Sequence, residues 1–210
     1  MALSEKELLA KVPTGLYIGG KWVEGSASKK ISVEDPATGS ILLEIANATA
    51  EDGLRALTAA DEAQSSWARV APRERSEILR RTFDLVRARS EEFAMLISME
   101  MGKPLAEARG EVASSAGLFD YYAEEAKRAH GRVLIRPTGQ RSIVIKQPVG
   151  PTATFTPWNF PVYLMTKKLA AAKKLADWAS SKDAMMLYGK NFAITAQPGV
   201  AQPLANVPKD

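Results

Sequence analysis

The chain has 210 residues, of which 46% are hydrophobic, so it is long and apolar enough to bury a core. Its net charge of +4 comes from 28 basic residues dispersed among 24 acidic ones, which favours a solvated mixed surface and no nucleic-acid partner. The sequence contains no cysteine, which excludes disulfides, thiolate metal sites and a cysteine nucleophile within these residues.

Short extended segments are predicted near the N-terminal end. Two apolar-aromatic runs flank Gly19-Gly20, which is typical of a hairpin over residues 16–24. Residues 31–33 and 41–45 are predicted as further strands on either side of the turn sequence at residues 35–39. We therefore expect a β meander at the start of the fold.

Helices are predicted next, from apolar residues at helical spacing. Thr49 and Asp52 form a capping box for the first, which is expected to run to about Arg69. Pro72 suits the first turn of the second helix.

A third helix is predicted over residues 91–101, with Ser90 as its cap and Gly102 at its end. Because the connections are short, these helices are expected to be antiparallel neighbours. A fourth helix is predicted over residues 105–129, ended by Gly131.

The C-terminal part is predicted to contain an edge strand over residues 142–149 and a short apolar strand over residues 152–156. A helix from about Pro161 follows. A strand, a polar loop and a helix make the local arrangement of an α/β ligand site, because ligands bind at the carboxyl ends of strands. A helical segment beyond residue 170 and a loop-like tail with prolines at 198, 203 and 208 complete the chain.

The loop between that strand and that helix reads Phe155-Thr156-Pro157-Trp158-Asn159-Phe160-Pro161. Its prolines stiffen the backbone around a carboxamide that is expected to be buried among bulky apolar groups. A buried carboxamide costs free energy unless its hydrogen bonds are satisfied. Asn159 is therefore expected either to cap local backbone or to await a ligand.

Several motifs between about residues 14 and 170 together resemble the N-terminal part of the NAD(P)-dependent aldehyde dehydrogenases. The similarity is greatest to members of the succinate-semialdehyde dehydrogenase type. The segments that carry it are residues 18–22, 35–39, 67–79, 100–104, 107–108, 110–112 and, above all, 148–161.

The resemblance implies an α/β fold: a partial Rossmann-like nucleotide-binding domain with an N-terminal β meander, a helical layer and an oligomerisation strand. Residues 1–170 would form an incomplete N-terminal, NAD-binding domain. Residues 171–210, a helix and a proline-containing tail, match no part of the family pattern. The segment over residues 142–149 resembles the arm through which family subunits form homo-oligomers.

The resemblance also implies site residues. Thr156, Pro157, Trp158 and Asn159 would lie beside the nicotinamide end of NAD or NADP, and Asn159 would donate to the oxyanion formed when a thiolate attacks the aldehyde. Lys168 matches a family lysine assigned to proton relay, or else is a solvated helix residue. Trp158 is otherwise a core or interface residue.

The remaining polar residues predict no second active site. His130 is expected to be structural or exposed near a helix end. The lysine pairs at 167–168 and 173–174, and the glutamates at 100, 107 and 111, are expected to form solvated charged faces. No metal cluster, serine–histidine–acid set or glycine-rich dinucleotide fingerprint can be assembled.

By resemblance, a complete member oxidises a small-molecule aldehyde or semialdehyde to the acid. This chain lacks the family's cysteine and general-base region, so we expect negligible activity from it alone. The alternatives are a non-catalytic protein that pairs through its edge strand, and a partly folded truncation product. With no signal peptide or membrane-spanning run, a cytoplasmic protein without membrane partners is expected.

Overall fold

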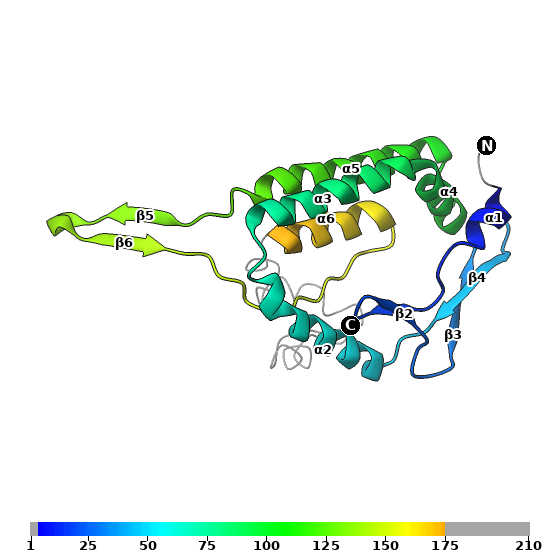
Figure 1. Cartoon of the computed structure of the whole chain (residues 1–210). Coiled ribbons are helices and arrows are strands. Elements are labelled where there is room, and N and C mark those ends of the chain that lie inside the picture. Colours follow the sequence, from blue (N-terminus) through cyan, green and yellow to red (C-terminus); the bar gives the residue numbers. More distant parts are fainter. Residues whose placement is uncertain (1–3, 175–210) are drawn as a thin grey trace, which may run out of the picture.

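The computed structural model describes residues 4–174, which form the mixed helix-and-strand fold in Figure 1. The strands pair as three antiparallel hairpins: β1 (Leu16–Ile18) with β2 (Lys21–Val23), β3 (Lys30–Glu34) with β4 (Ile41–Ala46), and β5 (Arg132–Ile135) with β6 (Arg141–Val144). The helices are α1 (Glu5–Leu9), α2 (Ala50–Trp67), α3 (Pro72–Ala88), α4 (Ser90–Met101), α5 (Leu105–Ala126) and α6 (Pro161–Lys174), with a 3₁₀ turn, Pro137–Gly139, between β5 and β6.

The first hairpin forms as predicted. Gly19 and Gly20 both have positive φ, 59° and 80°, which is the conformation that a two-residue hairpin turn requires. The strands of β3 and β4 are also where the sequence predicts them. They do not pair with β1 or β2, so the meander is divided into two separate hairpins.

The helix boundaries follow their local signals closely. The capping box is formed, since the Thr49 side chain accepts from the backbone of Asp52 and the Asp52 carboxylate accepts from the backbone of Thr49. Pro72 is in the first turn of α3, and Gly102, with φ of 70°, ends α4. The prediction that Ser90 caps α4 is wrong, because α4 begins directly after α3 and Ser90 is already its first residue.

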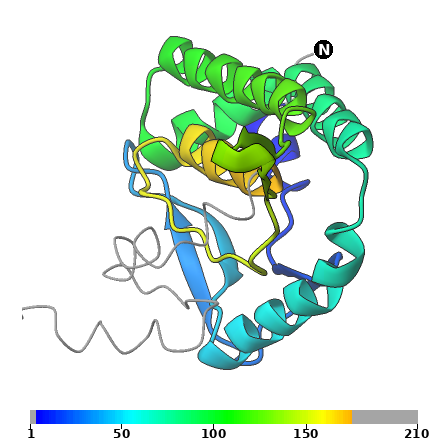
Figure 2. The ribbon, with the colours of Figure 1, turned by 90° about the vertical axis from the view of Figure 1, so that its left-hand side faces the viewer.

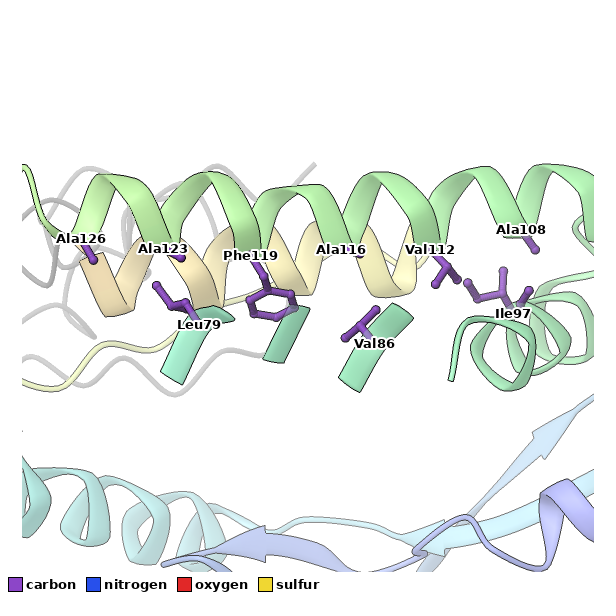
Figure 3. Packing of buried hydrophobic residues seen from close by; sticks show 10 residues of the cluster. Leu79, Val86, Ile97, Ala108, Val112, Ala116, Phe119, Ala123 and Ala126 are labelled. Atoms are coloured by element: carbon purple, nitrogen blue, oxygen red, sulfur yellow. The ribbon is translucent and has the colours of Figure 1, made fainter. Parts of the chain in front are cut away.

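The longest helix, α5, forms the centre of the packing, and it ends at Ala126 rather than near Gly131. One face of α5 is buried against α3 and α4, as Figure 3 shows for Phe119 and Ala123 beside Leu79 of α3. On another side α5 packs against α6.

The prediction that α2, α3 and α4 are antiparallel neighbours is wrong for α2, whereas α3 and α4 do contact each other. Figures 1 and 2 place α2 away from the other long helices, with β1 as the element it chiefly contacts. The physical reason is that α2 offers little apolar surface: its buried residue is Asp52, and its Leu54 is exposed. The alanine-rich face of α5, which also carries Val112 and Phe119, is the better partner for α3.

The segment between α5 and α6 departs most from expectation. The predicted strand over residues 142–149 is a strand only to Val144, and it pairs with β5, for which no strand was predicted. Residues 152–156 form no strand, because no other strand among residues 4–174 lies beside them to accept their hydrogen bonds. Helix α6 begins at Pro161 as predicted. The predicted tail with its prolines lies outside the described residues.

None of the helices in the described part of the chain combines the length and the hydrophobicity that crossing a bilayer requires.

Candidate functional site

The loop that precedes α6 presents the predicted site residues on the surface. Thr156, Pro157 and Asn159 are exposed, and 81% of the surface of Trp158 is open to solvent. The expectation that Asn159 is buried is therefore wrong, and so is the core alternative for Trp158. The reason is that residues 151–157 join no sheet, so nothing draws this loop into the interior. The predicted cofactor-side residues nevertheless lie together in one short exposed segment.

A carboxylate from α5 occupies the N-terminal end of α6. Glu111 Oε1 accepts hydrogen bonds from the backbone N–H groups of Val162, at 3.0 Å, and Tyr163, at 3.1 Å. First-turn N–H groups have no acceptor within their own helix, and the helix dipole favours a negative charge there. Phe160, directly before α6, has no side-chain oxygen to offer. Glu111 thus caps α6 from a neighbouring helix.

The other carboxylate oxygen of Glu111 pairs with Lys103. The Nζ atom of Lys103 lies 2.6 Å from Glu111 Oε2 and also donates to the backbone carbonyl of Asn159 at 3.2 Å. It lies 4.1 Å from the centre of the Phe160 ring, within cation–π range. The side chain of Glu111 is 1% exposed and that of Lys103 is 12% exposed. Both charges, the buried one of Glu111 and the largely covered one of Lys103, therefore have several partners, which a pair removed from water requires.

The structure corrects the prediction that Glu111 belongs to a solvated charged face. Glu100 and Glu107 are exposed as expected, but Glu111 is buried. The physical reason is the N-terminal end of α6, which is far away in sequence and supplies two donors. The sequence did contain a pattern that indicates burial of Glu111. It lies three residues after Ala108 and four before Ser115, and this spacing puts all three on the buried face of α5.

A hollow of about 370 Å³ opens beside this ion pair, a volume within the range of small-molecule sites. Its lining combines apolar rings with charged groups. Because Lys103 is already paired with Glu111, the second acid, Glu107, leaves the hollow with an excess of negative charge. The lining residues are Lys103, Glu107, Gly110, Glu111, Ser114, Phe160 and Tyr163.

Lys168, the other predicted catalytic residue, lies about two turns along α6. At 1.5 Å per residue it is roughly 10 Å along the axis from Pro161, so the structure does not place Lys168 next to Asn159. Lys168 is half-buried and takes part in an interaction, whereas Lys167 is exposed. The alternative that both lysines are solvated helix residues therefore holds for Lys167 and not for Lys168. His130 is exposed beyond the end of α5.

Among residues 4–174, no three His, Asp or Glu side chains are grouped so that they could hold a metal ion.

Comparison with known proteins covers most of the described residues. The model of the aldehyde dehydrogenase family matches residues 22–175. The chain is 56% identical, over 133 residues, to a succinate-semialdehyde dehydrogenase of Paenarthrobacter nicotinovorans, covering 63% of this chain and 30% of that protein. It is 46% identical, over 157 residues, to the mitochondrial succinate-semialdehyde dehydrogenase of Arabidopsis thaliana, covering 74% of this chain and 30% of that protein.

The fold is similar to solved structures as well. The crystal structure of succinate-semialdehyde dehydrogenase from Burkholderia pseudomallei superposes with a TM-score of 0.74 at 41% identity, covering 76% of this chain and 33% of that one. Betaine aldehyde dehydrogenase from Staphylococcus aureus, in complex with NAD+, gives a TM-score of 0.78 at 28% identity, covering 81% of this chain and 35% of that one. The chain thus spans about a third of the length of the relatives it matches.

Proposed function

The chain belongs to the aldehyde dehydrogenase family, and we propose that it carries the oxyanion-stabilising part of a site that oxidises an aldehyde or semialdehyde to the acid with NAD or NADP. The observation that carries the proposal is the Asn159 carboxamide. It is exposed two residues before the start of α6, and its side chain forms no hydrogen bond with residues 4–174, while Glu111 serves as the cap of the helix. A held amide with spare donors can bind a developing negative charge, and such a donor is typically worth about 2.7–4 kcal/mol of barrier.

The cofactor proposal rests on the same loop. One similar structure is a complex with NAD+, and another is described as an NADP dependent enzyme. The exposed segment Thr156–Pro157–Trp158–Asn159 would lie beside the nicotinamide ring, which supplies the hydride acceptor when bound. No glycine-rich turn suited to a pyrophosphate occurs in the sequence. We therefore expect weak binding of either dinucleotide by this chain alone.

The second proposed catalytic residue, Lys168, would hold or pass a proton behind the loop rather than touch the oxyanion. Its distance of roughly 10 Å along α6 from Pro161 supports an indirect role of this kind.

The proposed substrates are semialdehydes, the class named for the relatives. The distal carboxylate of a semialdehyde would bind poorly in the hollow beside Lys103. Two carboxylates, Glu107 and Glu111, line the hollow with one lysine, which is already paired, so a further negative charge would be repelled. The hollow is better suited to a neutral part of the ligand.

We propose that the 210-residue chain by itself does not turn over aldehyde. It contains no cysteine to form the covalent intermediate, and a serine or threonine would need an activating base. The experiment is an assay of the purified chain with succinate semialdehyde and NAD or NADP. No formation of reduced nicotinamide above the protein-free rate is expected, and a measurable rate would overturn this part of the proposal.

The role of Asn159 is tested in a hybrid that joins residues 1–170 to the remaining part of the Arabidopsis relative. An active hybrid should lose about 10²- to 10³-fold in kcat on the substitution Asn159→Ala. Asn47→Ala makes the same chemical change outside the loop and should leave kcat unaltered. An unchanged kcat for Asn159→Ala would refute the oxyanion role.

A second candidate function, homo-oligomerisation, is favoured by the β5–β6 hairpin, which projects from the helices in Figure 1. In its register Val133 pairs with Ile143 and Ile135 with Arg141, so Val133, Ile135 and Ile143 share one face. All three are exposed. A lone two-stranded hairpin is marginally stable in water, so an uncovered apolar face supports pairing with a second copy.

The oligomer proposal is tested by light scattering on the purified chain. Ile135, 87% exposed on the hairpin, is changed to Lys, and a shift from oligomer to monomer is expected. Ile41→Lys is the matched control, since Ile41 is 63% exposed on a different hairpin, and it should not alter the mass. A monomeric parent chain at all concentrations would end this proposal.

A further inference from the structure

Lys103 and Glu111 hold the backbone on both sides of Phe160. On the N-terminal side, Lys103 Nζ donates to the carbonyl oxygen of Asn159 at 3.2 Å. On the C-terminal side, Glu111 Oε1 accepts from two first-turn N–H groups of α6. The two side chains are joined to each other at 2.6 Å, so the loop and the helix are fixed to the same buried pair.

Little freedom remains between these two points of attachment. The ring of Phe160 lies 4.1 Å from Lys103 Nζ, and the ring of Pro161 fixes its own φ. Glu111 is buried on α5, and the side chain of Lys103, in the turn between α4 and α5, is 12% exposed. Helices α4 and α5, which flank this turn, both contribute residues to the buried core, so they are rigid supports for the loop.

We propose that Lys103 and Glu111 are positioning residues for Asn159. They act through the backbone. Lys103 donates to the Asn159 carbonyl oxygen, and the Asn159 side chain is attached to the Cα atom next to that carbonyl, so fixing the carbonyl also orients the side chain. The inference rests on the proposed oxyanion role of Asn159, for which the donor must be placed to within about 0.5 Å. Because Glu111 provides the helix cap, the Asn159 amide is not consumed in capping and stays directed by the backbone alone.

The chain offers a matched control pair. Arg109 of α5 and Glu91 of α4 form an ion pair of 2.8 Å in which both side chains are more than half exposed. This pair also joins α5 to α4, but its hydrogen bonds run between these two side chains and do not reach the loop before α6.

The experiment uses nuclear magnetic relaxation of the ¹⁵N-labelled 210-residue chain. The Phe160 amide shares its peptide plane with the Asn159 carbonyl, so its order parameter reports how firmly Lys103 holds that plane. A value near the rigid level of about 0.85 is expected in the parent chain, falling to about 0.6 or below in Lys103→Met. Lys103→Arg keeps the charge and should restore most of the order. Glu91→Gln should change nothing at Phe160.

Hydrogen exchange tests the second attachment. The amides of Val162 and Tyr163 should exchange about tenfold or more faster in Glu111→Ala, because they lose bonds to a charged acceptor. Glu111→Gln keeps an acceptor oxygen, so the exchange rates of these two amides should lie between those of the parent chain and of Glu111→Ala. Thermal melts establish that each variant is folded, and if Glu111→Ala is not, Lys103→Met and Glu111→Gln decide the question.

The inference is overturned if Phe160 stays rigid in folded Lys103→Met, or if Glu91→Gln loosens it equally. This outcome is distinct from failure of the proposed function. An Asn159→Ala hybrid with unchanged kcat removes the oxyanion role even where the order parameters change as expected. A rigid Phe160 in Lys103→Met removes the positioning role even where Asn159→Ala lowers kcat.

Discussion

Asp52 is the buried acid at the start of α2, and it connects that helix to the loop between β2 and β3. Its carboxylate accepts from the backbone of Thr49 and from the backbone and hydroxyl of Ser26. The backbone hydrogen bond from Thr49 is the main cause that lowers the pKa of Asp52 to about 2, against the opposing effect of burial. The side chain is therefore charged in the folded protein at all but very acidic pH.

This lowered pKa predicts a pH dependence of stability. The folded-state value is below the ordinary 3.8, so the contribution of Asp52 is fully present above about pH 4 and is lost as the pH falls toward about 2. Thermal melts between those limits should show a smaller acid-induced decrease of Tm in Asp52→Asn than in the parent chain. Asp61 is exposed on the same helix, so Asp61→Asn should show the same acid-induced decrease of Tm as the parent chain. Parallel curves for all three would contradict the prediction.

The site residues differ in how far the sequence could predict them. Asn159 and its neighbours were predicted as site residues from the proline-containing motif around them, and their role stays a prediction; they lie in the loop before α6. Their exposure was not predicted, since it depends on the absence of a pairing strand. The role of Glu111 was missed because its donors, Val162 and Tyr163, are more than fifty residues away, with separations of 51 and 52. Short-range patterns do not report such contacts.

At the scale of elements, local signals predicted boundaries well and packing poorly. The hairpin at Gly19-Gly20, the capping box of α2 and the start of α6 at Pro161 each depend on a few adjacent residues. Which helices pack together depends on which of them offers the larger apolar face to its neighbours. For this reason α3 packs on α5 rather than on α2. The strand expected at residues 152–156 failed for a related reason, because a strand exists only where another accepts its hydrogen bonds.

Glycines in two helical contexts give opposite predictions for the same substitution. Gly102, with φ of 70°, ends α4, and a Cβ there would lie 3.4 Å from Pro36. Gly102→Ala should lower the free energy of unfolding by roughly 1–2 kcal/mol, the cost of a left-handed conformation. Gly117, within α5, has open space around its Cβ position. Gly117→Ala should raise the free energy of unfolding by about 0.5–1 kcal/mol, since alanine is the better helix former.

Urea denaturation of the two variants and the parent chain measures this difference directly. The opposite signs are the decisive result, because a general effect of adding a methyl group would move both midpoints the same way. A loss of stability in both variants would show that Gly117 is needed for packing of α5.

At the scale of the whole molecule, the buried core is concentrated on one side. Apart from Leu8, the buried hydrophobic residues of the described part of the chain all lie in α3, α4 and α5. The strands β1 to β4 and helix α2 lie apart from these helices in Figure 2 and contribute mainly the polar cluster around Asp52. The site loop is supported from the core side, through Glu111 and Lys103. Stability and the candidate site are therefore provided by the same helices.

This asymmetry predicts that the molecule opens in parts. Amides in the middle of α3 and α5 should exchange most slowly, and those of α2 and β1 to β4 faster by on the order of 100-fold or more, because little buried apolar surface must be exposed to open them. Hydrogen exchange followed by mass spectrometry measures both regions in one sample. Leu79→Ala, which removes about 2–5 kcal/mol from the helical core, should speed exchange in α3 and α5 while leaving α2 nearly unchanged. Equal protection throughout, or equal acceleration of α2, would mean that the chain unfolds as one cooperative unit and that α2 shares the stability of the core despite its separation from it.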